Sequence, residues 1–219
     1  MRIVEAYVGE YASGKSENAV NRALQLAAAG RKVTLVDLDL VEPCYTLRPI
    51  KKMLEEKGLD VVAWETSETI GLGEAGCTMK PAMRWVLRRP GDIILDVGYG
   101  VYGARVLNLI EGAKNDPNLK VYAVINLGRS MTSNREDVRE YLRELGRVDG
   151  IINNSHLGKE TTLEFIQEGA LLIKEVADEL GIPLIATAAD KKMASEIGEK
   201  DVLGNPVWAL HRYMPHTFW

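Results

Sequence analysis

Residues 9–16 read G-E-Y-A-S-G-K-S, a full G-x-x-x-x-G-K-S pattern, and they directly follow an apolar run at residues 3–8. Glycines let consecutive backbone N–H groups turn toward one anion, and a helix that follows points its positive end at the same anion. The pattern therefore predicts a loop that binds the phosphates of a nucleotide. The predicted contacts are Gly9, Glu10, Tyr11, Ala12, Ser13, Gly14, Lys15 and Ser16.

Two side chains of this loop are expected to act on the phosphates directly. Lys15 is expected to reach the β- and γ-phosphates as a catalytic residue, and Ser16 is expected to bind Mg²⁺ through its hydroxyl. The apolar run before the loop is typical of a buried strand, and residues 15–29 carry an apolar face at helical spacing. A strand before the loop and a helix after it are the context that phosphate binding requires.

The composition fits one enzyme-sized domain that spans residues 1–219. The chain is 46% hydrophobic and 26% charged, so it can bury a sizeable core, and nothing in it indicates disorder. A net charge of -4 argues against a dedicated nucleic-acid binder, and no apolar run approaches the ~20 residues that span a bilayer. With no apolar leader before the first strand, we expect a cytoplasmic protein. Cys44 and Cys77 are too few for a zinc or iron-sulfur site within one chain.

Short β-like runs alternate with longer helical patterns along the chain. This alternation predicts an α/β fold of the P-loop NTPase type, in which a mostly parallel sheet of about seven strands has helices on both faces in three layers. Ligands are then expected at the carboxyl ends of the strands. The expected strands are 3–8, 32–37, 60–64, 92–97, 120–126, 148–153 and 184–188. The expected helices are 15–29, 50–57, 79–89, 104–114, 134–145 and 161–180.

Three carboxylates stand where such strands end. Asp37 and Asp39 follow the second strand two positions apart, so in an extended chain they share a face and can approach a phosphate-bound Mg²⁺. One would serve the water shell of the metal and the other the attacking water. The fourth strand ends in Asp96 and Gly98, an arrangement in which the acid holds Mg²⁺ through water and the glycine lets the backbone pass close to a γ-phosphate. Alternatively, these acids only end strands and cap turns.

The sixth strand ends in the sequence G-I-I-N-N-S-H at residues 150–156. An asparagine there can offer both a carbonyl and an amide group to a purine edge, although asparagine is also common in turns. The sequence has no N-K-x-D motif, whose aspartate would select guanine, and residues 153–155 supply no carboxylate. These residues therefore favour ATP over GTP.

In this order, G-x-x-x-x-G-K-S, V-D-L-D, D-V-G and I-N-N-S resemble the motifs of the SIMIBI class of P-loop NTPases. The match is to the branch that holds the septum-site-determining and partitioning ATPases, the nitrogenase iron protein and the cobyrinic-acid synthases. The resemblance implies that Asp39 activates water, Asp37 is its partner near the metal, Asp96 is the Walker B acid and Asn154 contacts adenine. It further implies ATP and Mg²⁺ as cofactors and a homodimer that sandwiches two ATP molecules.

The sequence departs from this branch in three ways. Glu10 stands where the branch has a signature lysine that reaches the nucleotide of the partner, and a carboxylate there repels phosphate, so slow turnover is expected. The cysteine pair that holds iron between protomers is absent, which argues against electron transfer. The segment 206–219 is too short and too interrupted by proline for the membrane helix of the septum-site proteins.

Two segments allow two interpretations each. The aromatic residues of the C-terminal segment either bind a partner or fold back over an edge of the sheet. The glycine-rich segment 65–77, with Lys80 after it, either forms a second substrate site or is a solvated flexible loop. The residues concerned are Trp208, Tyr213, Phe218 and Trp219 in the first, and Glu65, Glu68, Glu74, Cys77 and Lys80 in the second. No role is assigned to His156.

Three functions fit these residues. The first is a slow Mg-dependent ATPase that acts as a nucleotide-dependent switch or accessory factor, with a protein partner or a second copy of the chain. The second is an ATP-dependent small-molecule kinase or ligase, in which an acceptor takes the phosphoryl group instead of water. The third is a nucleotide-binding module without turnover, which Glu10 makes reasonable.

Overall fold

A single eight-stranded sheet runs through the part of the chain that the computed structural model describes, which is residues 1–40, 47–65, 68 and 78–214. The strand order is β3-β2-β4-β1-β5-β6-β7-β8, and every neighbouring pair is parallel. This confirms the predicted mostly parallel α/β sheet and adds one strand to it. The strands are β1 (Val4–Gly9), β2 (Val33–Leu38), β3 (Asp60–Val62), β4 (Asp92–Val97), β5 (Leu119–Ile125), β6 (Gly150–Asn153), β7 (Leu184–Asp190) and β8 (Val207–Leu210).

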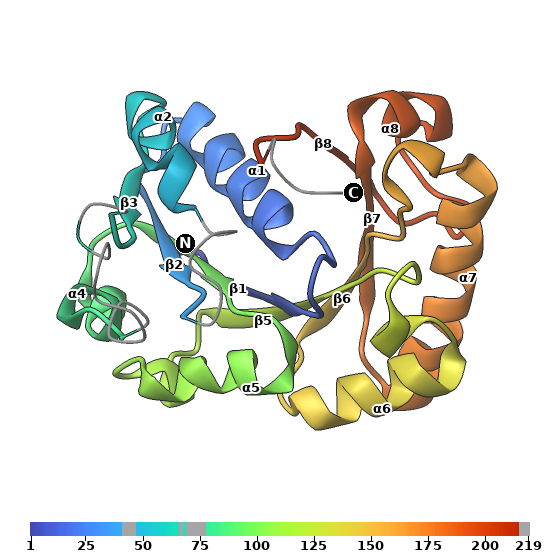
Figure 1. The fold of residues 1–219 in the computed structure, drawn as a ribbon, viewed down its shortest axis with the longest axis horizontal. Helices are drawn as coiled ribbons and strands as arrows, with labels where there is room; N and C mark the ends of the chain where they lie inside the picture. The colour runs from blue at the N-terminus through green and yellow to red at the C-terminus, as the bar shows by residue number, and fades with distance from the viewer. Residues whose placement is uncertain (41–46, 66–67, 69–77, 215–219) are drawn as a thin grey trace.

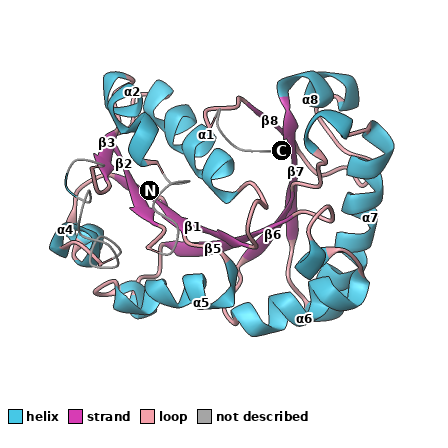
Figure 2. Ribbon diagram, in the orientation of Figure 1, coloured by secondary structure: helices cyan, strands magenta, loops and turns pink. Residues whose placement is uncertain are grey.

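Helices cover both faces of the sheet. Figure 1 shows α1 and α2 on one side of the strands and α5 and α6 on the other, and Figure 2 shows the same layers coloured by secondary structure. The α-helices are α1 (Lys15–Ala28), α2 (Lys51–Glu56), α4 (Pro81–Arg84), α5 (Gly100–Ala104), α6 (Arg135–Leu145), α7 (Leu163–Leu180) and α8 (Lys191–Ile197). Short 3-10 helices cover Arg48–Ile50, Val86–Arg88, Arg105–Leu109, Ala113–Asn115, Ser130–Thr132 and Gly158–Glu160.

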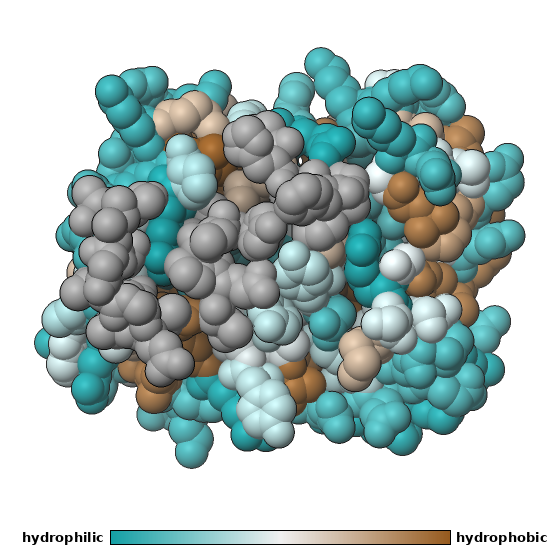
Figure 3. All heavy atoms as spheres, in the orientation of Figure 1, coloured by the Kyte–Doolittle hydropathy of each residue, from teal (hydrophilic) through white to brown (hydrophobic). Residues whose placement is uncertain are grey.

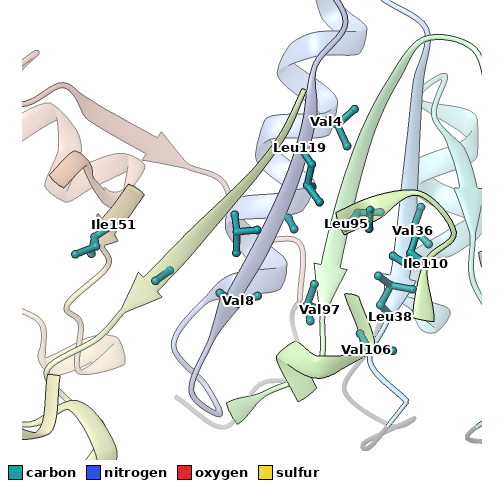
Figure 4. Close-up of a cluster of buried hydrophobic side chains, with 14 of the residues drawn as sticks. Val4, Val8, Val36, Leu38, Leu95, Val97, Val106, Ile110, Leu119 and Ile151 are labelled. Atoms are coloured by element: carbon teal, nitrogen blue, oxygen red, sulfur yellow. The ribbon is translucent and has the colours of Figure 1, made fainter. Parts of the chain in front are cut away.

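The core has two main layers because successive side chains of a strand point to opposite faces of the sheet. In β1, Ala6 and Val8 pack toward α5, α6 and α7, while Tyr7 packs toward α1. Figure 4 shows the first layer, with Val8, Val97 and other apolar side chains between the strands and the helix that carries Val106. The strands β1, β2 and β4 are buried along their whole lengths, as expected for a parallel sheet covered on both faces.

Two of the predicted helices are only partly α-helical. Residues 79–89 form the short α4, which begins at Pro81, and a 3-10 turn, and the backbone is extended again at Arg89. Residues 104–114 are mostly 3-10 structure, and Gly112 with φ 87° interrupts them. Helix α5 lies before this stretch and starts at Gly100. A side chain on Gly103 of this helix would overlap the backbone of Gly98.

The C-terminal segment confirms the edge-covering interpretation for its described residues. Strand β8 pairs along β7, with Ala188 opposite Trp208 and Asp190 opposite Leu210. Phe218 and Trp219, like Cys44, Glu74 and Cys77, lie outside the described residues.

Charged and polar side chains gather over α6 on the face seen in Figure 3. Every helix in the described ranges is too short or too polar to cross a membrane.

Candidate nucleotide-binding site

The predicted phosphate loop leaves β1 at Gly9 and enters α1 at Lys15. Its backbone curls inward, because Ala12 and Gly14 adopt left-handed conformations with φ 55° and 92°. The Ser13 backbone N–H donates to the Glu10 carbonyl at 3.1 Å, and the Lys15 ammonium donates to the same carbonyl at 3.2 Å. The loop thus holds its lysine across its own opening, at the positive end of the helix.

The two glycines of the pattern are required by close contacts. A Cβ on Gly9 would lie 2.5 Å from the Val124 carbonyl oxygen and 2.6 Å from Ser13 Oγ. A Cβ on Gly14 would overlap the side-chain amide of Asn154, and its φ of 92° is one that other residues rarely adopt. Packing within the chain therefore requires glycine at both positions.

Asn154, the predicted adenine contact, binds the loop itself. Its side-chain nitrogen Nδ2 donates to the Ser13 carbonyl at 2.7 Å, and the residue is buried after the end of β6. One of the two amide hydrogens is engaged in this way, so a contact from Asn154 to a base would use the other hydrogen or the oxygen Oδ1. The described geometry gives Asn154 a supporting role for the loop that the sequence interpretation did not include.

The three predicted acids meet at the carboxyl ends of β2 and β4. Asp37 and Asp96 are register partners on the two adjacent strands and both are buried. Asp37 Oδ1 accepts from the Asp39 backbone N–H at 3.1 Å, which fixes the turn that carries Asp39. A Cβ on Gly98 would lie 3.2 Å from Asp39 Oδ1, so this glycine leaves room for the carboxylate. The sequence prediction that these acids lie together is supported by their placement.

Asp96 is the group at this site whose ionisation changes most. Burial raises its pKa from 3.8 to about 8, the charge of Asp37 adds to this rise, and Lys15 and Ser16 of the loop lower it only in part. The Ser16 hydroxyl lies close enough to act on this carboxylate as a hydrogen-bond donor, but no hydrogen bond of normal geometry reaches either oxygen in the described part of the chain. A buried carboxylate left in this way costs folding free energy unless a cation or a proton neutralises it.

Mg²⁺ fits this donor set. It prefers a few oxygen ligands together with water and phosphate, and the Ser16 hydroxyl and the carboxylates of Asp37 and Asp96 supply such oxygens. No group of three or more His, Cys, Asp or Glu side chains with the arrangement of a metal site occurs among the described residues. A bound ion would therefore need phosphate oxygens and water to complete its coordination.

A pocket extends from the loop toward the edge of the sheet that β7 and β8 form. At the loop it is lined by Tyr11, Ala12, Gly14, Lys15, Ser16, Asp39 and Asn154, all of which were predicted site residues. Asp37 and Asp96 lie buried at the adjoining strand ends, outside the lining of the pocket. The ring of Tyr11 packs edge-to-face against the ring of Tyr99, with centroids 5.4 Å apart. Tyr99 also lines the pocket and was not among the predicted site residues.

Glu10 takes part through its backbone. The Glu10 carbonyl accepts hydrogen bonds from the Ser13 N–H and the Lys15 ammonium, and Glu10 does not line the pocket. After burial, the negative charge of Glu10 is the second cause that raises the pKa of Tyr141 on α6. The carboxylate therefore acts on the side of the loop that faces α6, at the position where the resembling branch carries its second lysine.

The far end of the pocket is more apolar and is assembled from separate segments. Ile166 comes from α7, Ala188 and Ala189 from β7, and Leu210 and Met214 from the C-terminal segment. An apolar crevice beside a phosphate loop is suited to a purine ring. Its polar lining includes Asp190, Arg212 and His156, none of which the sequence interpretation assigned to the site.

Asp190 changes the argument about the base. One carboxylate oxygen, Oδ1, accepts from the Lys192 and Met193 backbone N–H groups at 2.8 and 3.2 Å and so caps α8. The residue also lines the pocket, so β7 supplies a carboxylate there, whereas residues 153–155 supply none. The lack of a carboxylate after β6 is therefore not sufficient to exclude guanine.

His156 is neutral in this pocket. Burial lowers its pKa to about 4, and the charges of Arg129 and Arg212 contribute to the decrease. Its Nδ1 accepts from the Gly158 backbone N–H at 3.3 Å, so the ring proton is assigned to Nε2. The imidazole thus offers one N–H donor at neutral pH.

The described acids of the glycine-rich segment pair with lysines away from this pocket. Glu65 accepts from Lys51 at 2.8 Å, and Glu68 accepts from Lys80 at 2.5 Å. The Lys80 ammonium also lies 4.3 Å from the centre of the Trp64 ring. None of these residues lines the nucleotide pocket, and Glu74 and Cys77 fall outside the described part of the chain.

Comparison with known proteins supports the fold. No protein-family model matches the sequence, and no curated protein matches it. Among solved structures, the cell division protein FtsY from Thermotoga maritima shares 19% identity at a TM-score of 0.59, covering 88% of this chain and 63% of that one. The signal recognition particle receptor FtsY from Elizabethkingia anophelis in complex with GDP shares 16% identity at a TM-score of 0.58, covering 88% of this chain and 58% of that one.

A third similar structure is the signal recognition particle 54 kDa protein from Aeropyrum pernix K1 in complex with GDP. It shares 23% identity at a TM-score of 0.52, covering 84% of this chain and 40% of that one. This chain spans less than two thirds of the length of each of these proteins. At these identities the likeness establishes a shared α/β P-loop NTPase fold.

Proposed function

We propose that this protein binds a purine nucleoside triphosphate with Mg²⁺ and hydrolyses it slowly, as a nucleotide-dependent switch or accessory factor. The observation that carries the proposal is the position of buried Asp96, whose carboxylate lacks a normal hydrogen-bond partner in the described part of the chain. Lys15 and Ser16 of the phosphate loop lie close enough to influence its pKa. Such a group is suited to a cation that arrives together with phosphate.

The chain's own groups bind the phosphates. Backbone N–H groups at the start of α1 and the Lys15 ammonium supply positive charge at the loop. Ser16, Asp37 and Asp96 are the residues that would hold Mg²⁺. When bound, the ion would neutralise charge on the β- and γ-phosphate oxygens.

Asp39 is the proposed acceptor for a proton from the attacking water. It lines the pocket beside Lys15, and the Asp37 carboxylate holds its backbone in place. Lys15 would stabilise charge that develops on the transferred phosphoryl group. Slow turnover is proposed because Glu10 replaces the additional cation of the resembling branch with a carboxylate.

ATP is the proposed nucleotide, on the basis of the asparagine pair after β6, with GTP as the second candidate. Two observations favour the guanine nucleotide: Asp190 lines the pocket, and two of the similar structures are complexes with GDP. A carboxylate accepts from the ring N–H and amino group of guanine, whereas adenine offers only an amino donor at that edge. Competition between ATP and GTP for the wild-type protein and Asp190→Ala would assign the base.

We further propose that bound triphosphate changes the association of the protein with a second copy or another protein. Mass measurement with ADP and with a non-hydrolysable triphosphate analogue tests the homodimer, since an unchanged mass would exclude it under those conditions. The kinase or ligase alternative would require an acceptor beside the γ-phosphate. We also propose that the protein acts in the cytoplasm.

The proposed function is tested by phosphate release from Mg·ATP and Mg·GTP. We expect slow release that requires Mg²⁺ and is lost in Asp39→Ala, while nucleotide binding persists. Tight binding with no release from the wild type would instead favour the module without turnover. Release that is indifferent to Asp39→Ala would remove this residue from the mechanism.

A further inference from the structure

The C-terminal chain crosses the first turns of α1 directly after β8. We call residues 210–214 the C-terminal strap. The backbone of His211 exchanges two hydrogen bonds with the side chain of Asn21: its N–H donates to Oδ1 at 2.9 Å, and its carbonyl accepts from Nδ2 at 2.8 Å. The backbone N–H groups of Tyr213 and Met214 donate to the Glu17 carboxylate, the shortest of these bonds being 2.8 Å. The strap is therefore attached to the helix that begins with Lys15.

Burial strengthens this attachment. Leu210 and Met214 are buried, and they belong to the same apolar cluster as Ala19 and Val20 of α1. The Glu17 carboxylate is itself largely buried, and this burial raises its pKa even though the two strap N–H groups act in the opposite direction. A buried carboxylate that accepts backbone N–H groups leaves little freedom to the segment that donates them.

The strap also forms one wall of the nucleotide pocket. Four of its five residues line the pocket, and Leu210 stands beside Asp190 at the end of the sheet. His156 and Ile166 line the same crevice. This wall faces the end of the pocket away from Asp39, where a base and ribose would lie if the phosphates occupied the loop.

We propose that the C-terminal strap is the segment that recognises the nucleoside part of the bound nucleotide, with Arg212 as its polar contact. A guanidinium group can stack on a purine face, and Leu210 and Met214 supply apolar contact. The inference rests on the proposed function, because it concerns the same pocket. Docking of the strap on α1 and binding of the nucleoside then stabilise each other reciprocally.

The experiment compares two ligands that share phosphates but differ in the nucleoside. Calorimetry measures binding of Mg·ATP and of Mg·tripolyphosphate to the wild type, to Asn21→Ala and to the matched control Gln25→Ala. Gln25 lies one turn further along α1 and its side chain accepts from Arg22. We expect Asn21→Ala to weaken Mg·ATP about tenfold, because two hydrogen bonds of the strap are lost. Mg·tripolyphosphate binding and the control should match the wild type.

Each other outcome has a distinct meaning. Equal weakening of both ligands by Asn21→Ala would mean that it perturbs the phosphate loop, and no weakening of either would mean that the strap is not a binding wall. Both results overturn the inference and leave the proposed function intact. A wild type that binds neither ligand would refute the proposed function itself.

A second variant and a second measurement guard against misfolding of Asn21→Ala. Arg212 is exposed, so Arg212→Ala is expected to fold normally and to weaken Mg·ATP severalfold without changing Mg·tripolyphosphate. In the wild type, hydrogen exchange of the Tyr213 and Met214 amides should slow with Mg·ATP and not with Mg·tripolyphosphate. Equal protection by both ligands would contradict recognition of the nucleoside by the strap.

Discussion

The two ends of the pocket are built from the chain in different ways. The phosphate end comes from one contiguous loop, residues 9–16, with acids from two adjacent strands. The nucleoside end comes from three separate parts of the chain: residues 155–166, residues 188–190 and the C-terminal strap. A contiguous loop leaves a motif in the sequence, whereas an assembled crevice leaves none. We therefore expect substitutions at the first end to abolish binding and those at the second to tune it.

The largest effect is expected for Lys15→Ala. Loss of a buried cation at the phosphates should weaken Mg·ATP by about 100-fold, in line with roughly 1.5–3 kcal/mol for hydrogen bonds to charged groups. Calorimetry measures this, with the exposed Lys52→Ala on α2 as the control for loss of one charge. If both variants bind like the wild type, the phosphate end is not where the loop sequence places it.

The next effect separates catalysis from binding at the same end. Asp39→Ala should reduce phosphate release by roughly 100-fold, the lower range for loss of a general base, while Mg·ATP binding changes little. Asp39→Asn should behave alike, since it keeps the size of the side chain but accepts a proton poorly. A fall in affinity as large as the fall in rate would assign Asp39 to binding instead.

A smaller effect tests how the two ends are joined. Gly14→Ala should destabilise the fold by roughly 1–2 kcal/mol from its left-handed backbone, with a further loss from overlap with the Asn154 amide. Denaturant unfolding of Gly14→Ala, Asn154→Ala and the double variant forms a double-mutant cycle. In the double variant, only the part of the lost unfolding free energy that comes from the overlap with Asn154 should be regained. Strict additivity would mean that the close contact between loop and β6 end has no energetic weight.

The smallest effect concerns pH. Because the folded pKa of Asp96 is raised from 3.8 to about 8, the folded protein holds this proton more tightly than the unfolded chain does. The contribution of Asp96 to stability therefore falls as pH rises through this window. Without Mg²⁺, Asp96→Asn should unfold at a temperature several degrees above the wild type at pH 8, with a smaller difference at pH 5.

The control for this measurement is the exposed Glu56→Gln on α2, which should follow the wild-type pH profile. Addition of Mg·ATP at pH 8 should stabilise the wild type more than Asp96→Asn, because the variant lacks the carboxylate. Parallel pH profiles for wild type and Asp96→Asn would show that this carboxyl does not titrate as its surroundings imply.

Much of the fold could be predicted because its strands are buried on both faces. Residues 3–8 and 92–97 read as apolar runs, and the structure contains β1 and β4 within one residue of these limits. Strand β8 and helix α8 were missed. An edge strand of four residues and a helix of seven residues carry too few apolar positions to set a period.

The candidate site divides in the same way. The loop and the acids Asp37, Asp39 and Asp96 could be selected because each stands at a strand end within a short motif. Asp190 and Arg212 could not, since they gain meaning only when β7 and β8 pair at the pocket. Asn154 was selected for a base, and the loop contact through its amide depends on a distance that the sequence does not contain.

The central claim is that the turn between β1 and α1 holds the polyphosphate of a magnesium-bound nucleotide. Titration calorimetry of the wild type with Mg·ATP and with Mg·GTP tests it most directly. We expect saturable heat with one nucleotide per chain for at least one of the two, and none for Lys15→Ala at the same concentrations. If neither nucleotide gives heat with the wild type, the loop does not bind a polyphosphate.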